Sequence, residues 1–320
     1  MSPTRRSATL GLLAATGAAL PAIRAAAQAV PADLEAPQTE MPDEDVTPTS
    51  LDTGRDRNEH MLAPVTINGQ GPFNFLLDTG ANVSCVSNKL MQRLDLPAGE
   101  MTRVHTVVGV RNRPTVILDQ LQVGDRNRRQ VRAPALPIQG AEVDGVLGVD
   151  WLKGQRLVLD FKGKKLEIVR SRADRDEPGR VVVVPARRRH GQLTIVDADL
   201  SGRKISAIID SGAQGSLCNR LLRDIVREQS ARRGDVEPTK FVRMETLAGE
   251  SFTGESIFLP FLRLGGLHLG NVGVTYADMH VFDIWGLKDS PALVIGMDLL
   301  TQFEEVALDF GRSQVKFAYT

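Results

Sequence analysis

Two aspartates in this sequence stand in the same local context, and together they could carry out acid–base chemistry. Asp78 follows the apolar run 73–77 and opens an Asp-Thr-Gly-Ala motif, while Asp210 follows the run 205–209 and opens Asp-Ser-Gly-Ala. Two carboxylates a few ångström apart cannot both ionise cheaply, so such a pair shares one proton. The ionised member would take a proton from a water molecule, and the protonated member would donate a hydrogen bond to the carbonyl oxygen under attack. This chemistry is peptide-bond hydrolysis, and it requires no protein nucleophile.

The elements that must position this pair are duplicated in the sequence. Short motifs recur in the same order in two halves of the chain, which is the signature of an internal repeat. The matched pairs, in chain order, are 73–81 with 205–213, 106–109 with 246–249, 146–152 with 294–300, and 157–169 with 306–318. The duplication predicts two lobes of one fold that face each other across a pseudo-twofold axis, with one aspartate from each lobe.

Most of the predicted secondary structure is strand. Short runs rich in Val, Ile, Leu and Phe alternate with Gly-containing turn sequences, which is typical of all-β lobes. Helix is predicted only over 88–94, over 219–229 and in short turns after Gly148 and Gly296. By composition and pattern the chain divides into a signal peptide (1–29), a disordered acidic linker (30–60), an N-terminal lobe (61–170), an inter-lobe linker (171–180) and a C-terminal lobe (181–320).

Both halves resemble the retropepsin-like aspartic proteases, the group that contains the retroviral proteases and many bacterial relatives. The resemblance is carried by the Asp-Thr-Gly-Ala and Asp-Ser-Gly-Ala motifs and by the apolar-apolar-Gly elements at 146–148 and 294–296, and it covers residues 61–320. It implies an all-β fold of two acid-protease β-barrel lobes related by a pseudo-twofold axis. It also implies an aspartic endopeptidase that carries both motifs in one chain and is active as a monomer.

The resemblance also implies a role for individual residues. Asp78 and Asp210 would be the catalytic pair, and the hydroxyls of Thr79 and Ser211 would brace the two loops against each other. The residues expected to support these loops are Thr79, Gly80, Ala81, Ser211, Gly212 and Ala213. The segments 106–113 and 246–254 would be hairpin flaps over a substrate bound as an added β-strand. The flap residues expected to contact that substrate are Val108, Gly109, Ala248 and Gly249.

The composition argues against other classes of function. Lys+Arg and Asp+Glu both number 39, so the net charge is zero, whereas a nucleic-acid-binding protein usually carries a basic surplus. The chain has two Cys and five His, with no pair at the spacing of a metal site. We therefore expect no metal, no cofactor and no nucleic-acid partner.

The N-terminal residues predict export. Arg5 and Arg6 precede a moderately apolar run over 8–23, and Ala-Gln-Ala at 27–29 offers a cleavage site, as in a signal peptide. The arginine pair resembles a twin-arginine signal, with an ordinary secretory signal as the alternative. Either route predicts a periplasmic or secreted protein with no stable membrane span after cleavage.

Alternative interpretations accompany the main one. The runner-up function is a peptide-binding protein that keeps the protease fold without turnover. A second Asp-Thr-Gly triplet, at 52–54, follows polar chain rather than an apolar strand and is expected to play no part. Cys85 and Cys218 are expected to be buried thiols rather than a disulfide. His105, beside the first predicted flap, is expected to lie exposed at a strand end.

Overall fold

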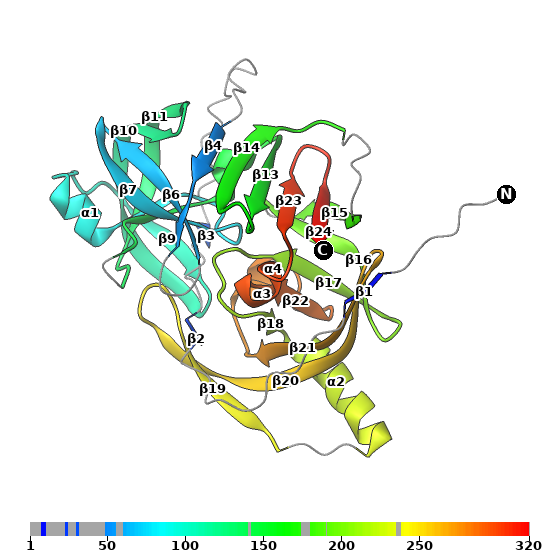
Figure 1. The fold of residues 1–320 in the computed structure, drawn as a ribbon. Helices are drawn as coiled ribbons and strands as arrows, with labels where there is room; N and C mark the ends of the chain where they lie inside the picture. The colour runs from blue at the N-terminus through cyan, green and yellow to red at the C-terminus, as the bar shows by residue number, and fades with distance from the viewer. Residues whose placement is uncertain are drawn as a thin grey trace.

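The protein folds into two β-barrel lobes with a shared sheet between them (Figure 1). The computed structural model describes residues 8–10, 23–24, 30–31, 49–55, 60–139, 142–173, 180–189, 191–234 and 238–319. Each lobe contains a closed six-stranded barrel, so the predicted all-β, two-barrel fold is confirmed. The lobes lie on either side of the shared sheet, with the N-terminal lobe in blue to cyan and the C-terminal lobe mainly in yellow to orange.

The two barrels have the same strand order. In the N-terminal lobe the order around the barrel is β6 (Met61–Ile67), β7 (Gln70–Leu77), β12 (Gly145–Leu147), β8 (Cys85–Ser87), β11 (Arg126–Leu136) and β10 (Gly109–Val123), closed by β10 on β6. In the C-terminal lobe the order is β16 (Gln192–Leu200), β17 (Arg203–Ile209), β22 (Ala292–Ile295), β18 (Leu217–Cys218), β21 (Leu267–Tyr276) and β20 (Ser251–Leu264), closed by β20 on β16. The predicted duplication is therefore present strand for strand.

The strands that lead into the two motifs are buried on both faces at their ends. Phe75, Leu76 and Leu77 close β7, and Ile208 and Ile209 close β17, all nearly inaccessible to solvent. Each of these strands lies between an antiparallel neighbour and a parallel one, β12 or β22. A strand covered on both faces reads as a continuous apolar run, which is why each aspartate follows such a run in the sequence.

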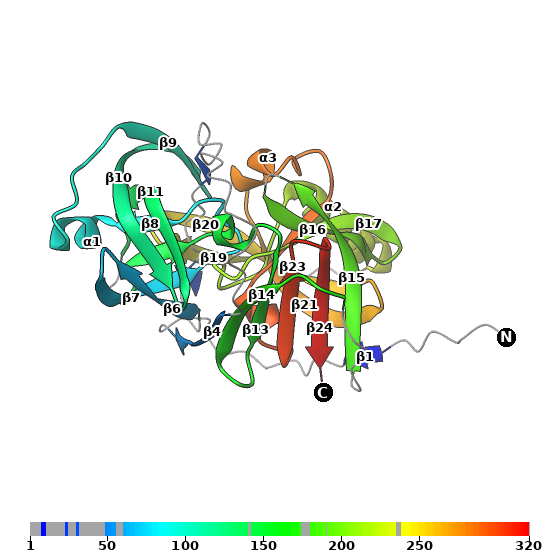
Figure 2. The same cartoon turned by 90° about the horizontal axis from the view of Figure 1, so that it is seen from above.

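A sheet formed by both lobes joins them (Figure 2). Its order is β4 (Thr49–Asp52), β14 (Lys165–Arg170), β13 (Gln155–Asp160), β23 (Glu305–Asp309), β24 (Gln314–Tyr319) and β15 (Arg180–Arg189). At its centre β13 pairs with β23, with Leu157 opposite Leu308. Arg156 and Asp309 form a buried ion pair of 2.9 Å between these two strands. The pseudo-twofold relation therefore extends to this sheet, because β13 and β23 hold matching places in the two halves.

The prediction of a disordered linker over 30–60 is wrong at both ends. Residues 49–52 form β4, the outermost strand of the shared sheet, and β5 (Gly54–Arg55) pairs with β6. Most of these residues are polar or glycine, with Leu51 as the one apolar side chain that joins the core, but an edge strand needs few apolar contacts when its backbone pairs with a neighbour. At the other end β3 (Val30–Pro31) pairs with β9 (Met101–Thr106).

Most of the predicted signal peptide lies outside the described residues. Within it the structure places β1 (Ala8–Leu10) beside β21 and β2 (Ile23–Arg24) beside β19 (Lys240–Glu245). Among the described residues no helix has the length and apolar character needed to cross a membrane.

Two helices follow the motif loops, as predicted. α1 (Asn88–Arg93) begins at Ser87, whose hydroxyl accepts a hydrogen bond from the third residue of the helix. α2 (Arg220–Arg233) begins at Asn219, whose side chain accepts one in the same way. The short turns after the later glycines are a 3₁₀ turn (Val149–Leu152) and α4 (Met297–Leu300). One short helix, α3 (Val281–Ile284), was not predicted.

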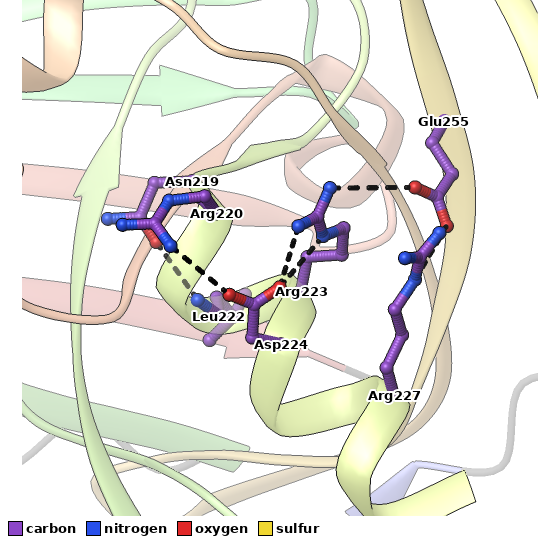
Figure 3. A network of polar contacts seen from close by, with 7 residues as sticks. All are labelled: Asn219, Arg220, Leu222, Arg223, Asp224, Arg227 and Glu255. Carbon is purple, nitrogen blue, oxygen red and sulfur yellow. Dashed lines mark hydrogen bonds and ion pairs between the residues drawn. The ribbon is translucent and has the colours of Figure 1, made fainter. Parts of the chain in front are cut away.

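The longer α2 docks on its barrel through charged side chains (Figure 3). Arg227 forms an ion pair of 2.8 Å with Glu255 of β20, and Arg223 hydrogen-bonds Asp224 at 2.7 Å. The Arg223 guanidinium also lies 4.1 Å from the centre of the Tyr276 ring. The same helix also buries Leu222, Ile225 and Val226, so this Arg-rich helix is held on the barrel by apolar packing together with contacts from its arginine heads to Glu255 and Tyr276.

Candidate active site

The structure brings Asp78 and Asp210 to the interface between the lobes, each at the end of a buried strand. Both side chains are inaccessible to solvent. The Asp78 backbone N–H donates to the Leu147 carbonyl at 3.0 Å, and the Asp210 N–H donates to the Ile295 carbonyl at 2.9 Å. Each aspartate is therefore fixed by the strand that contains the two apolar residues of the apolar-apolar-Gly element of its own lobe.

Each carboxylate is oriented by backbone donors from its own loop. Oδ1 of Asp78 accepts hydrogen bonds from the N–H groups of Gly80 at 2.8 Å and Ala81 at 3.0 Å. Oδ1 of Asp210 accepts them from Gly212 at 2.9 Å and Ala213 at 3.2 Å. The Oδ2 atoms of both aspartates are buried and accept no hydrogen bond from the described residues. Thus Oδ1 of each carboxylate is held by two backbone N–H groups of its own loop, whereas Oδ2 is not.

The hydroxyls of Thr79 and Ser211 connect the two loops. Thr79 Oγ1 donates to the Ile209 carbonyl at 2.9 Å and accepts from the Ser211 N–H at 3.0 Å. Ser211 Oγ donates to the Leu77 carbonyl at 2.9 Å and accepts from the Thr79 N–H at 3.1 Å. Each hydroxyl therefore forms hydrogen bonds with the two backbone groups that flank the motif aspartate of the other lobe. These hydrogen bonds form the expected brace between the two loops.

The two loops approach closely enough that only glycine fits at Gly212. A Cβ on this residue would lie 2.3 to 2.6 Å from the carboxylate atoms of Asp78. Such distances are far inside van der Waals contact, so any side chain here would displace the carboxylate. Gly212 therefore places the Asp78 carboxylate directly against the loop of Asp210.

A second pair of matched residues, which the sequence analysis did not single out, supports the loops from behind. Ser84 Oγ donates to Asp150 at 2.8 Å and accepts from the Gly148 N–H at 3.1 Å. Ser216 Oγ donates to Asp298 at 2.7 Å and accepts from the Gly296 N–H at 3.0 Å. Both serines follow their motif aspartate at the same offset, and this repeated offset is the signal that could have found them.

Burial dominates the electrostatics of the pair. It raises the pKa of Asp78 well above its ordinary value, and the neighbouring Asp210 carboxylate raises it further. Burial also raises the pKa of Asp210, to about 6, although the hydrogen bonds from the N–H groups of Gly212 and Ala213 oppose the rise. The two directions together describe a pair in which one carboxyl still holds its proton when the other ionises at about pH 6.

The two predicted flaps are hairpins that reach into the opposite lobe. The tip between β9 and β10 buries Val107 in a cluster of C-terminal side chains, and Val108 packs against the same cluster. The tip between β19 and β20 packs Leu247 against a cluster of the N-terminal lobe. Arg111 Nε donates to Glu250 Oε1 at 2.8 Å and joins the two flaps. The flap residues expected to contact substrate, Val108, Gly109, Ala248 and Gly249, all lie at or beside these tips.

Several residues outside the pair are also placed by the structure. Asp52 is exposed on β4, the outermost strand of the shared sheet, where it pairs with Lys165 of β14. Cys85 and Cys218 are both free and buried, as predicted, and burial raises the pKa of each thiol. The prediction for His105 is wrong, because its ring is half-buried and stacks on His280 of the other lobe, with ring centres 5.1 Å apart.

No cluster of His, Cys, Asp or Glu suited to a metal ion occurs in the part of the chain that the structure describes. The site described above consists only of carboxylates, hydroxyls and backbone groups. Its candidate chemistry is therefore that of the carboxylate pair itself.

The duplicated barrel with one motif loop from each lobe is the arrangement of a two-lobed retropepsin-like fold. An aspartyl protease family model matches residues 63–151 and 196–299, one segment in each lobe. These segments make up more than half of the chain, and the chain belongs to the aspartyl protease family. No curated protein matches the chain significantly.

Proposed function

We propose that this protein is an aspartic endopeptidase that hydrolyses peptide bonds with Asp78 and Asp210 as its catalytic pair. The observation that carries the proposal is the pair of buried Oδ2 atoms, which are left without hydrogen bonds from described residues while each Oδ1 is fixed by its loop. Preorganised groups of this kind are what an active site requires. The family match supports the class of reaction.

The mechanism follows from one proton shared between two carboxyls. The ionised carboxylate accepts a proton from a water molecule held between the aspartates, and the resulting oxygen nucleophile attacks the peptide carbonyl carbon. The protonated carboxyl donates a hydrogen bond to the carbonyl oxygen and stabilises the tetrahedral intermediate. Proton transfer to the leaving nitrogen then breaks the C–N bond and restores the shared proton.

The substrate class is an extended peptide segment, bound as an added strand beneath the flaps. The edges of β9 and β19 support this proposal, because short strands of the chain's own N-terminal region pair there, β3 with β9 and β2 with β19. Main-chain hydrogen bonds to such an edge supply affinity without regard to sequence. With the predicted signal peptide, we propose that the substrates are exported or periplasmic proteins and that the enzyme acts as a monomer.

The test uses protein that begins at Val30, incubated with a mixed peptide library from about pH 4 to about pH 8, a range that brackets the titration of such a pair. We expect cleavage by the wild type, and a loss of about 100- to 10,000-fold in Asp78→Asn and in Asp210→Asn. Asp52→Asn is the matched control, because it alters the Asp-Thr-Gly triplet at 52–54, where Asp52 is exposed. It should cleave as the wild type does.

A different outcome would favour the second candidate function. If the wild type binds library peptides but cuts none at any pH, the protein is a peptide-binding relative that keeps the fold without turnover. If only one of the two Asp→Asn variants loses activity, the shared-proton mechanism is wrong.

A further inference from the structure

The matching strand registers identify which residue of each lobe approaches the motif loop of the other. In the N-terminal lobe Leu62 pairs with Leu76, which lies two residues before Asp78. In the C-terminal lobe Thr194 pairs with Ile208, which lies two residues before Asp210. Side chains two residues apart on a strand share a face. The residues two positions before Leu62 and Thr194 are therefore equivalent: His60 and Gln192.

Gln192 shows what this position does. It is 1% exposed, and its Nε2 donates to the Gly80 carbonyl at 3.0 Å and to Asn82 Oδ1 at 2.7 Å. Gly80 and Asn82 belong to the loop of Asp78, so this C-terminal residue reaches across the interface. Gln192 thereby fixes the carboxylate loop of the other lobe with a neutral amide.

His60 occupies the equivalent position on the other side. It is 3% exposed, and the loop residues that correspond to Gly80 and Asn82 are Gly212 and Gln214. Its proximity to that loop is supported by its charge interaction with Asp210, which lowers the pKa of this aspartate against the larger effect of burial. The two lobes therefore present different chemistry at one position, an amide beside the loop of Asp78 and a titratable imidazole beside the loop of Asp210.

We propose that His60 is a positioning residue whose positive charge makes Asp210 the ionised member of the catalytic pair and leaves Asp78 as the member that carries the proton. This inference rests on the proposed function, and it assigns the roles within that site. Asp210 then activates the water, and Asp78 donates to the substrate carbonyl. An imidazolium stabilises a nearby carboxylate by Coulomb attraction, which is strong in a buried site. A glutamine amide at the same place does not distinguish the two states by charge.

The other charged groups around the pair leave this asymmetry in place. Asp78 faces Asp210 from the opposite loop. Two further carboxylates behind the motif loops, Asp150 and Asp298, occupy matching positions in the two lobes, and each accepts a hydrogen bond from a serine. Arg128 lies 3.9 Å from Asp150, so its charge acts mainly on that carboxylate. Asp150 and Asp298 thus carry the same chemistry in both lobes. His60 and Gln192 do not, because one side chain is titratable and the other is neutral.

The test compares His60→Gln with Gln192→Ala. His60→Gln makes the two positions identical, keeps a donor and removes only the charge. We expect the acid limb of the kcat/KM profile to move upward by about half to one pH unit. Gln192→Ala removes the contact to the Asp78 loop without changing any charge, so kcat/KM should fall while the acid limb stays in place. His60→Asn, a second neutral variant with an amide donor, guards against a folding defect in His60→Gln.

A second readout does not depend on turnover. ¹³C NMR of the aspartate carboxyls follows the titration of the pair in the wild type and in His60→Gln, and Asp78→Asn and Asp210→Asn assign the signals. We expect the carboxyl of lower pKa to be Asp210, and its midpoint to rise in His60→Gln. If the midpoint rises in a protein that cleaves nothing, the proposed function fails and the charge effect of His60 stands. If the protein cleaves but neither the acid limb nor the midpoint moves, the role of His60 is overturned.

Discussion

The two lobes hold their motif aspartates with the same kinds of groups, but they differ in the elements that surround those aspartates. Both have the same barrel order, the same hydroxyl brace and the same serine behind the loop. They differ in the helix that follows the loop, which has 6 residues in α1 and 14 in α2, and in the residue that faces the opposite loop. The shared features orient both carboxylates in the same way, and in our proposal the different residues at positions 60 and 192 give the two carboxylates different roles.

The two flaps are also alike, because the tip of each flap packs against the opposite lobe. Val107 of the first flap is buried in the C-terminal lobe, and Leu247 of the second packs on the N-terminal lobe. The two flaps differ in charge where they meet, because the first flap contributes Arg111 and the second contributes Glu250. The flap contact is therefore another place where the two halves are complementary rather than identical.

The largest change in stability is expected from variants of the hydroxyl brace, a feature that the two lobes share. Thr79→Val and Ser211→Ala each remove a hydroxyl that bonds two buried backbone groups of the other lobe. Leaving a buried polar group unsatisfied costs about 1 to 3 kcal/mol. We expect each variant to lose about 2 to 5 kcal/mol of unfolding free energy, measured by urea denaturation, and the two losses to be similar.

The control for the hydroxyl variants is Thr53→Val, which removes an exposed hydroxyl bonded to the Lys164 carbonyl. This change should cost less than about 0.5 kcal/mol, as for surface substitutions in general. A large loss in only one of the two lobes would contradict the equivalence of the brace.

The second effect depends on pH. Because folding raises the pKa of Asp210 to about 6 from 3.8, the folded protein binds this proton more tightly than the unfolded chain does. The resulting stability is present below about pH 4 and is lost as the pH rises through about 6. Asp210→Asn removes the charge, so we expect it to stabilise the protein at pH 7 by about 2 to 3 kcal/mol.

The measurement is thermal and urea unfolding of the wild type and Asp210→Asn between about pH 4 and about pH 7, where the linkage acts. The difference should shrink toward zero at the acid end. Asp52→Asn, at an exposed position, is the control and should change little across this range. A stabilisation of Asp210→Asn that is independent of pH would mean that charge burial is not its cause.

The smallest effect concerns the ion pair between the flaps. Arg111 and Glu250 lie 2.7 Å apart, but their side chains are 42% and 21% exposed, and an ion pair screened by solvent contributes about 0.2 to 1 kcal/mol. We expect Arg111→Gln or Glu250→Gln to speed hydrogen exchange of the flap-tip amides by about two- to fivefold. The charge-swapped double variant, Arg111→Glu with Glu250→Arg, should restore protection.

Arg132→Gln is the matched control for the flap variants, because it breaks an ion pair with Glu100 of 3.0 Å within one lobe. Exchange at the flap tips should not change in this variant. If both single flap variants and the swapped variant exchange equally fast, the charges do not hold the flaps together.

Much of the fold and the centre of the site could be predicted from local sequence. The apolar runs before Asp78 and Asp210 predicted buried strands, and the repeated motifs predicted two lobes of one fold. The helices predicted over 88–94 and 219–229 are present as α1 and α2, which begin after Ser87 and Asn219. By contrast, residues 49–55 were predicted to be disordered, because their strand depends on backbone pairing with β14 and β6 rather than on an apolar pattern.

The duplication, the two motif loops and their side-chain chemistry can be recognised in the amino-acid sequence, because each depends on residues close together in the chain. Which residues face those loops from the opposite lobe is visible only in the folded molecule. His60, Gln192, Arg111 and Glu250 carry no local pattern, and their partners lie more than a hundred residues away in the chain. The physical reason is that strand pattern specifies which side of a sheet is buried, while contacts between lobes depend on how two complete barrels dock.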